Sequence, residues 1–284
     1  MTRELPNLIL LLYSDPADAA TRALVEQAAR LPCEILPISL SQLLDEAVIG
    51  SVWKCSGRTI DPSRTAVVNR LVFMESDDRS GPLQSFFQRE QFWVWLTGEL
   101  ERFAYVSALP SAVSPVGSLG SLADQWSDLP EWVPALRVPE HRRAGDSIEG
   151  LRGDVHLVDS QRLYSLGQRA AVASGIVPRG HLAYVRPAGK LFHVAQVGGL
   201  FVVPNAPPQM DPQARAHVEA FVRTMAASSA GRILEHAFFE GESVPVFYST
   251  FPIPVVTGRM PVYGELIVRG LQDDIEHRCR RAVA

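Results

Sequence analysis

The chain opens on an unbroken apolar run from Leu8 to Tyr13, followed by the polar turn Ser14-Asp15-Pro16. A short apolar run that ends in a turn indicates a buried strand, and an acidic residue before a proline is typical of a helix start, with Asp15 as the N-cap. Ala17 to Arg30 then carries Ala, Leu and Val at helical spacing, and Glu34 to Ile38 indicates a second strand. Strand, helix and strand in this order predict the beginning of an open α/β sheet.

Further elements follow from the same periodicities. Leu83 to Leu109 is expected to be a long helix, whose aromatic and aliphatic residues form one broad apolar face that we assign to core packing. Gly198-Gly199 is expected to be a hairpin turn, because no helix start follows it and a phosphate loop requires one. The other expected strands are Ile49–Trp53, Arg58–Ile60, Ala66–Phe73, Val155–Val158, and the pair His181–Val185 and Leu191–Val203; the other expected helices are a short one within Leu119–Trp132, Ser160–Ser174 and Asp211–Ser229.

The C-terminal stretch from Gly231 to Pro254 carries the most informative pattern. It indicates a strand, an acidic turn at Glu240-Gly241-Glu242, a second strand through Thr250, and a loop punctuated by prolines. A helical tail is expected from Tyr263 onward. The whole pattern predicts a mixed α/β protein.

Composition fits an ordinary globular protein and narrows its partners. The 284 residues are 46% hydrophobic and 20% charged, and a net charge of −4 gives no basic footprint for nucleic acid. The apolar run near the N-terminus is too short to span a membrane, so we expect no membrane partner. Cys33, Cys55 and Cys279 are few and scattered, which suggests no disulfide framework or zinc site and favours a reducing cytoplasm. Only Lys54 and Lys190 are lysines.

The C-terminal skeleton resembles the last segment of the ATP-grasp superfamily, whose members join a carboxylate to an amine with ATP. The order of elements is most similar to that of the peptide-modifying ATP-grasp ligases, on the strand that ends at Arg70, the Arg89-Glu90 pair and the glycine hairpin before Val203. The resemblance implies an ATP-grasp-like fold in three parts. These are an N-terminal α/β unit over residues 1–110, a lid-like region over residues 111–180 and a C-terminal grasp-like unit over residues 181–284.

The chain departs from the family where the chemistry resides. The family uses two lysines against the nucleotide phosphates, one of them on a strand similar to Gly153–Val158, which holds no lysine here. The family's second C-terminal strand carries a Glu and an Asn that hold Mg²⁺, and Tyr248 and Thr250 stand near those positions. Leu191-Phe192-His193 stands where the family often has Asp-Ile-Arg. A triphosphate needs fixed cations and Mg²⁺ needs hard oxygen ligands, so the resemblance implies a degraded site.

Five residues remain as candidates for the site. Arg186, Lys190 and His193 are candidates to bind a nucleotide phosphate or a carboxylate, with an ordinary exposed hairpin as the alternative. Arg70 is a candidate to bind an acidic substrate group, because strand ends border ligand crevices, or else forms a structural ion pair with Glu90. Glu235 is the candidate metal ligand, with an edge-strand charge as the alternative.

Three hypotheses for function follow. The leading one is a non-catalytic binding protein or partner subunit in a peptide- or amino-acid-modifying pathway, which binds a peptide or a partner enzyme. The second is an active carboxylate–amine ligase with atypical ligands, which alone requires ATP and Mg²⁺. The third is an unrelated α/β binding protein, because similarity of fold does not establish function.

Overall fold

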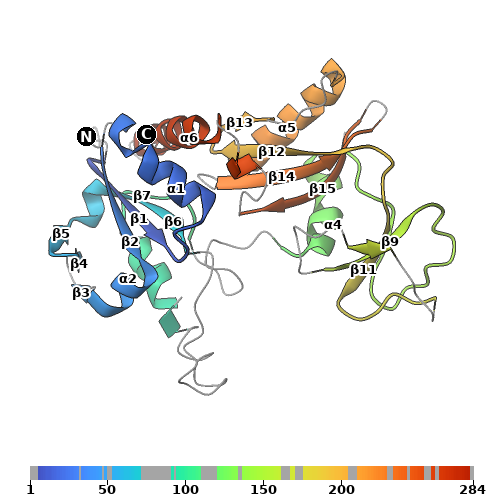
Figure 1. Ribbon diagram of the computed structural model, residues 1–284, viewed down its shortest axis with the longest axis horizontal. Helices are drawn as coiled ribbons and strands as arrows, with labels where there is room; N and C mark the ends of the chain where they lie inside the picture. The colour runs from blue at the N-terminus through green and yellow to red at the C-terminus, as the bar shows by residue number, and fades with distance from the viewer. Residues whose placement is uncertain are drawn as a thin grey trace.

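The computed structural model describes residues 6–31, 33–46, 48–49, 53–71, 91–92, 94–109, 120–133, 136–160, 167–169, 175–203, 210–228, 233–241, 244–252, 257–259 and 262–281. These residues form a mixed α/β fold with three four-stranded sheets and one small three-stranded sheet. Figure 1 shows the N-terminal sheet at one end of the molecule and the other two larger sheets toward the opposite end. The α/β fold class predicted from the sequence is confirmed.

The N-terminal sheet is parallel and has the strand order β2-β1-β6-β7. Its central strand β1 is buried on both faces, as the unbroken apolar run predicts. One face packs against α1 and α6, and the other against α2, the helical residues 94–100 and the small sheet β3-β4-β5. The strands and helices of this part are β1 Leu8–Tyr13, α1 Ala19–Glu26, β2 Glu34–Ser39, α2 Leu40–Glu46, β3 Val48–Ile49, β4 Trp53–Cys55, β5 Arg58–Ile60, β6 Thr65–Arg70 and β7 Tyr105–Val106.

The middle sheet is antiparallel and has the strand order β10-β9-β11-β8. Leu182 and Val158 face the core built with helix α4, so this sheet buries one face against the helix. The elements are α4 Leu122–Trp132, β8 His141–Arg142, β9 Val155–Asp159, β10 Gln168–Arg169 and β11 His181–Val185.

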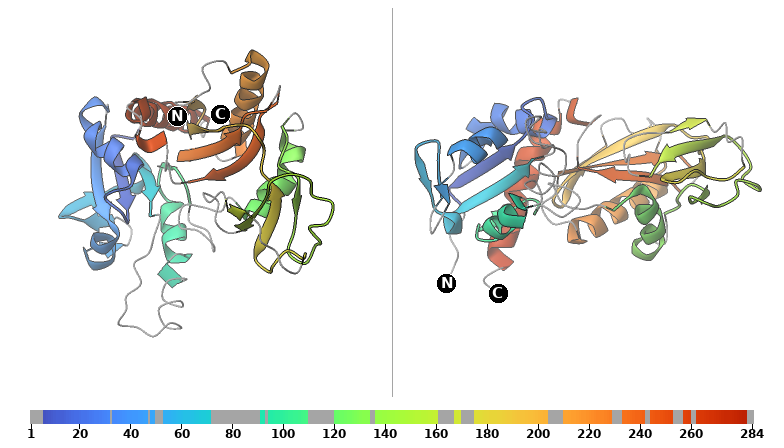
Figure 2. Two further views of the ribbon diagram at one scale, coloured as in Figure 1. Left: turned by 45° about the vertical axis from the view of Figure 1, so that its right-hand side comes forward. Right: turned by 90° about the horizontal axis from the view of Figure 1, so that it is seen from below.

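The C-terminal sheet is also antiparallel, with the order β13-β12-β14-β15. Helix α5 covers one face, and α6 returns to pack between this sheet and the N-terminal sheet, as Figures 1 and 2 show. Gly198-Gly199 forms the turn between β12 and β13, as predicted. The elements are β12 Leu191–Val197, β13 Leu200–Val202, α5 Pro212–Ser228, β14 Ile233–Phe239, β15 Val246–Phe251 and α6 Val262–Arg281. The described residues also contain 3₁₀ turns at Ala28–Arg30 (η1), Pro62–Arg64 (η2) and Thr257–Arg259 (η3).

Several sequence-based expectations for elements are wrong. The expected helix Leu83–Leu109 is helical at residues 91–92 and 94–100, but residues 101–109 form a turn and β7; residues 83–90 lie outside the described part. The expected helix Ser160–Ser174 contains strand β10, because Gln168 and Arg169 pair with β9. Ile49–Trp53 is not one strand, since β3 and β4 are antiparallel partners.

The expected pairing of His181–Val185 with Leu191–Val203 is also wrong, because β11 pairs with β8 and β9 whereas β12 pairs with β13 and β14. The helix N-cap is Asp18, whose carboxylate accepts a hydrogen bond from the Thr21 backbone N–H at 2.9 Å, and not Asp15. The division of the chain at residues 110 and 180 stays a prediction.

Candidate functional site

Glu235 lies on β14, an inner strand of the C-terminal sheet, and its side chain is fully buried. Its Oε2 accepts hydrogen bonds from the backbone N–H and the hydroxyl of Thr257, at 2.7 and 2.6 Å. Its Oε1 lies 3.0 Å from Nδ1 of His193, at the distance of an ion pair but without the direction of a hydrogen bond. The alternative of an edge-strand charge is therefore wrong, and both carboxylate oxygens already have protein partners.

The register of β15 determines which residues share a face with Glu235. Phe251 is its cross-strand partner, and Thr250 stands opposite His236 on the other face. A bulge at Ala237/Phe238 shifts the register at this point. The ring of Phe251 also packs against His193, with centroids 6.4 Å apart. Glu235 is thus surrounded by an aromatic ring, an imidazole and a threonine rather than by further carboxylates.

Thr250, one of the two positions where the resemblance places a metal ligand, belongs to a buried polar network. Its hydroxyl lies 2.7 Å from Nδ1 of His236, and Nε2 of His236 lies 2.7 Å from Oε1 of Gln196. Gln196 donates its amide hydrogens to backbone carbonyls, so its oxygen must accept from His236 and the imidazole carries its proton on Nε2. Burial lowers the pKa of His236 to about 3, which keeps this network neutral.

Tyr248, the other such position, fills the space between the middle and C-terminal sheets. Its ring lies 5.6 Å from Tyr184 of β11 and 5.8 Å from Trp126 of α4, and all three side chains are buried. Trp126 donates its indole N–H to the carbonyl of Tyr248 at 2.6 Å. The two tyrosine hydroxyls are hydrogen-bonded to each other, and burial raises the pKa of both phenols. Aromatic packing therefore occupies this junction.

Arg186 follows β11 and lies beside Asp154, at the start of β9. Its backbone N–H donates to the carbonyl of Asp154 at 2.9 Å, and its guanidinium is close enough to help lower the pKa of the Asp154 carboxyl. The hydrogen bond from His156 is the main cause of that lowered pKa. Arg169 of β10 also contacts Asp154, with its Nε at 3.1 Å from Oδ1.

Lys190 precedes β12 and faces the end of β14. Its backbone carbonyl accepts from the N–H of Glu240 at 2.9 Å, and its own N–H donates to the Glu240 carboxylate at 3.4 Å. Gly189 beside it runs so close to this strand end that a Cβ would lie 2.0 Å from the Glu240 carbonyl oxygen. Lys190 therefore stands in a backbone-paired strand junction.

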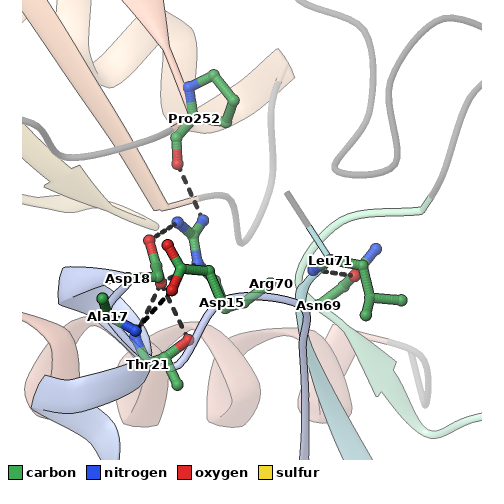
Figure 3. A network of polar contacts seen from close by, with 8 residues as sticks. All are labelled: Asp15, Ala17, Asp18, Thr21, Asn69, Arg70, Leu71 and Pro252. Carbon is green, nitrogen blue, oxygen red and sulfur yellow. Dashed lines mark hydrogen bonds and ion pairs between the residues drawn. The ribbon is translucent and has the colours of Figure 1, made fainter. Parts of the chain in front are cut away.

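Arg70 ends β6 and is buried in a polar network drawn in Figure 3. Its Nε and Nη2 donate to the two oxygens of Asp18 at 2.9 and 2.7 Å, and its Nη1 donates to the carbonyl of Pro252 at 2.9 Å. Burial raises the pKa of Asp18, but the Arg70 charge and hydrogen bonds outweigh it, and the pKa is lowered. The expected pairing with Glu90 falls on a residue outside the described part. Arg70 is a structural link between the N-terminal sheet and the end of β15.

The five candidate residues thus occupy different places. His193 and Glu235 are in contact, whereas Arg186 lies with Asp154, Lys190 with Glu240 and Arg70 with Asp18. Within the described residues, no group of three or more His, Cys, Asp and Glu side chains could hold a metal ion. A Mg²⁺ ion prefers several oxygen ligands in octahedral geometry, and Glu235 alone, with both oxygens engaged, does not fit that need.

Comparison with solved structures defines the fold. The chain aligns with the ATP-grasp ligase PsnB complexed with a minimal precursor at a TM-score of 0.64 and 13% identity, over 97% of this chain and 99% of that chain. It aligns with the macrocyclase MdnC of Microcystis aeruginosa MRC, bound with precursor peptide MdnA, at a TM-score of 0.61 and 8% identity, over 94% and 99% of the two chains. This chain has the ATP-grasp fold.

More distant ATP-grasp ligases share that fold. D-alanine–D-alanine ligase from Bacillus anthracis, complexed with ATP, aligns at a TM-score of 0.53 and 11% identity over 97% of this chain and 99% of that one. No family model matches the sequence, and no curated protein matches it. The shared fold confirms the ATP-grasp-like architecture that the resemblance implies. No helix among the described residues has the length and apolarity needed to cross a membrane.

The sequence reasoning missed the residues that occupy the junction. Trp126 and Tyr184 were assigned only to a short helix and a strand, although both are buried against Tyr248. An aromatic residue on each of two elements is a signal of core packing, but it does not reveal that the two elements face each other. Asp154 and Asp18 were also missed as partners of the arginines.

Proposed function

We propose that this chain is a non-catalytic ATP-grasp-fold protein that acts by binding, as a partner subunit or peptide-recognition factor in a peptide- or amino-acid-modifying pathway. The filled junction between β11 and β15 carries the proposal. The resemblance places a phosphate-binding lysine on the strand similar to β9 and metal ligands on β15. Here Tyr184, Tyr248 and Trp126 pack between those two sheets.

The electrostatics support the same function. Stabilising a transferring phosphoryl group requires cations and metal arranged before the reaction begins. The two oxygens of Glu235 are in contact with His193 and Thr257, and Phe251 stands beside it where a second oxygen ligand would be needed. The ligand set therefore favours a buried structural carboxylate over a metal site.

The names of two structural neighbours support a polypeptide as the bound molecule. PsnB and MdnC are each described in complex with a precursor peptide. A retained fold with an altered reaction centre is consistent with a chain that keeps polypeptide recognition and has lost ligation. A reducing cytoplasm stays a prediction, supported by the free thiols Cys33 and Cys55.

The alternative is an active ligase in which Arg186 contacts phosphate and Glu235 shares a metal. ATP and Mg²⁺ are cofactors only under this alternative. The separate surroundings of Arg186 and Glu235, beside Asp154 and His193 respectively, weigh against it.

Release of ADP tests the proposed function. The full chain is incubated with Mg²⁺ and ATP, alone and with a synthetic peptide that contains glutamate and lysine, and ADP is measured. We expect ADP at the level of a protein-free control. Mg²⁺-dependent release that is lost in Glu235→Gln and kept in the surface variant Glu219→Gln would contradict the proposal.

A further inference from the structure

An uneven distribution of charge marks the inner face of the middle sheet, where β9 starts and β11 ends. Asp154 is the one carboxylate that the described residues place on this face, and Nε2 of His156 and Nε of Arg169 approach its two oxygens, at 2.9 and 3.1 Å. Arg186 lies on the same face, because Val155 pairs with Val185 and Asp154 therefore stands opposite Arg186. Two guanidinium groups and one imidazole thus surround a single carboxylate.

The Arg186 guanidinium lies near the Asp154 carboxylate, whose pKa it helps to lower, but it makes no direct ion pair among the described residues, and Arg186 is exposed. Arg169 is 85% exposed, so it is free to reorient while Asp154 keeps its contact with His156. His156 also has an unused polar atom. Its side chain is 9% exposed, and within the described part of the chain its Nδ1 has no hydrogen-bond partner. The group is therefore short of acceptors on the protein side.

We infer that Arg169 and Arg186 form a docking site for an acidic segment of a partner polypeptide. The inference rests on the proposed function and adds the chemistry of the partner to it. Each guanidinium presents a planar fork of donors that matches a carboxylate in bidentate geometry. An acidic segment supplies the acceptors that the protein lacks at this place.

The spacing of the two arginines favours a polypeptide over a single small anion. Arg169 of β10 pairs with His156 of β9, whereas Arg186 stands opposite Asp154, two positions away along β9. Two strand spacings and this offset place the backbones of the two arginines about 12 Å apart. Two acidic residues four positions apart on an extended chain span about 13 Å and point to the same side of it. A nucleotide is disfavoured because the neighbouring rings of Tyr184 and Tyr248 are buried against each other, so neither offers an exposed face on which a base could stack.

Fluorescence anisotropy of a labelled oligoglutamate peptide tests the inference on the full chain. Oligoglutamine of the same length, oligothymidylate and ATP with Mg²⁺ serve as the other probes. The variants are Arg186→Gln and Arg169→Gln, singly and together, and Arg215→Gln is the matched control because Arg215 is an exposed arginine on α5 with Glu219 as its partner. Near-ultraviolet circular dichroism establishes that each variant is folded.

We expect oligoglutamate to bind, to weaken as salt screens the charges, and to lose roughly tenfold in affinity with each of the two arginine variants. Arg215→Gln should bind as the wild type does. Absence of oligoglutamate binding, equal binding by Arg186→Gln, or equal or tighter binding of oligothymidylate would overturn the inference. If oligoglutamate does not bind and no ADP is released, the docking site is overturned and the proposed function still stands. If ATP displaces the peptide only when Mg²⁺ is present, that result contradicts both the docking site and the proposed function.

Discussion

Two buried tyrosine hydroxyls differ in whether they have a hydrogen-bond partner. Tyr263 of α6 is 1% exposed, and its hydroxyl has no hydrogen-bond partner within the part of the chain that the structure describes. Burial raises the pKa of this phenol well above its usual value, which keeps the hydroxyl protonated. Tyr248 is buried to the same degree but has Tyr184 as its hydrogen-bond partner.

The two tyrosines therefore respond differently to loss of the hydroxyl. We expect Tyr263→Phe to leave the free energy of unfolding unchanged or to raise it by up to about 1 kcal/mol, because an unpaired buried hydroxyl is removed. Tyr248→Phe should lower it by about 1 kcal/mol, since it leaves the Tyr184 hydroxyl without its partner. Urea unfolding measures both. A Tyr263→Phe variant that is the less stable of the two would contradict this assignment.

His236 gives the fold a pH dependence of known sign. Its pKa is about 3 in the folded chain and about 6.5 when unfolded. Between these two pKa values the unfolded chain binds a proton at His236 that the folded chain does not. The contribution of His236 to the free energy of unfolding is therefore complete above the pKa of the unfolded chain and is lost as the pH falls below it. We expect His236 to contribute a loss of about 2 kcal/mol between about pH 6.5 and about pH 5.

Replacement of the imidazole by a group that does not titrate isolates that contribution. His236→Gln should unfold in urea with a smaller change between these two pH values than the wild type, whatever its stability at neutral pH. An identical change in both proteins would show that His236 is not buried in neutral form.

Residue partners that are distant in the sequence could not be predicted from it. The position of Arg70 at a strand end suggested an acid-binding role, with a structural ion pair as the alternative; the structure shows an ion pair, but with Asp18, 52 positions earlier, as the partner. Glu90 was the expected partner because the resemblance includes the Arg89-Glu90 pair, and no local pattern indicates that α1 approaches β6. Glu235 and His193 were singled out from the sequence, while their contact depends on the register of β12 and β14.

At the level of elements, α6 shows how close packing fixes a fold. Gly270 of this helix faces β12, and a Cβ there would lie 2.6 Å from the Cβ of Val197 and 2.7 Å from its carbonyl oxygen. Gly264 on the same helix would gain only ordinary contacts with Gln27, at 3.5 Å. The two glycines form a matched pair, since both are helical and only one lies against backbone.

Alanine substitution at these positions should have opposite effects. Gly270→Ala should lower the free energy of unfolding by about 1–3 kcal/mol, because helix and strand must move apart. Gly264→Ala should leave it unchanged or raise it by up to about 1 kcal/mol through helix propensity. Chemical denaturation of the two variants tests this. Equal stability of the two variants would mean that α6 does not pack on β12 as described.

Apolar runs and apolar periodicity predicted the elements that end at clear turn residues, and failed where one apolar spacing continues across two elements. The run before Ser14, the helix from Pro212 and the pair β14 and β15 were all predicted. Residues 101–109 were assigned to a helix because Phe103 continues its apolar spacing, whereas the chain turns there into β7. The pairing of β11 with β9 rather than with β12 depends on which strands the chain brings together over long sequence distances, and no local pattern shows this.

At the level of the whole molecule, Arg70 joins the N-terminal sheet to the end of β15 through Asp18 and the Pro252 carbonyl. Asp18→Asn should lower the free energy of unfolding by about 3–5 kcal/mol, since it leaves a buried guanidinium without its counter-charge. Arg58→Gln, which removes the exposed ion pair with Glu34, should change it little.

The ion pair of Asp18 with Arg70 gives the stability of the fold a second pH dependence. Because the pKa of Asp18 is lowered by folding, its contribution is present above the unfolded value of about 3.9 and is lost as the pH falls below it. Urea unfolding of wild type and Asp18→Asn at neutral and acidic pH checks this, and a difference between the two that does not shrink on acidification would contradict it.

The account of the whole molecule depends on one claim, that the ATP-grasp fold is retained here without nucleotide chemistry. Titration calorimetry of the full chain with ATP, with and without Mg²⁺, tests it most directly. We predict no heat of binding at millimolar nucleotide in either condition. Saturable binding that requires Mg²⁺ and is lost in Glu235→Gln would contradict the claim and would support the ligase with atypical ligands.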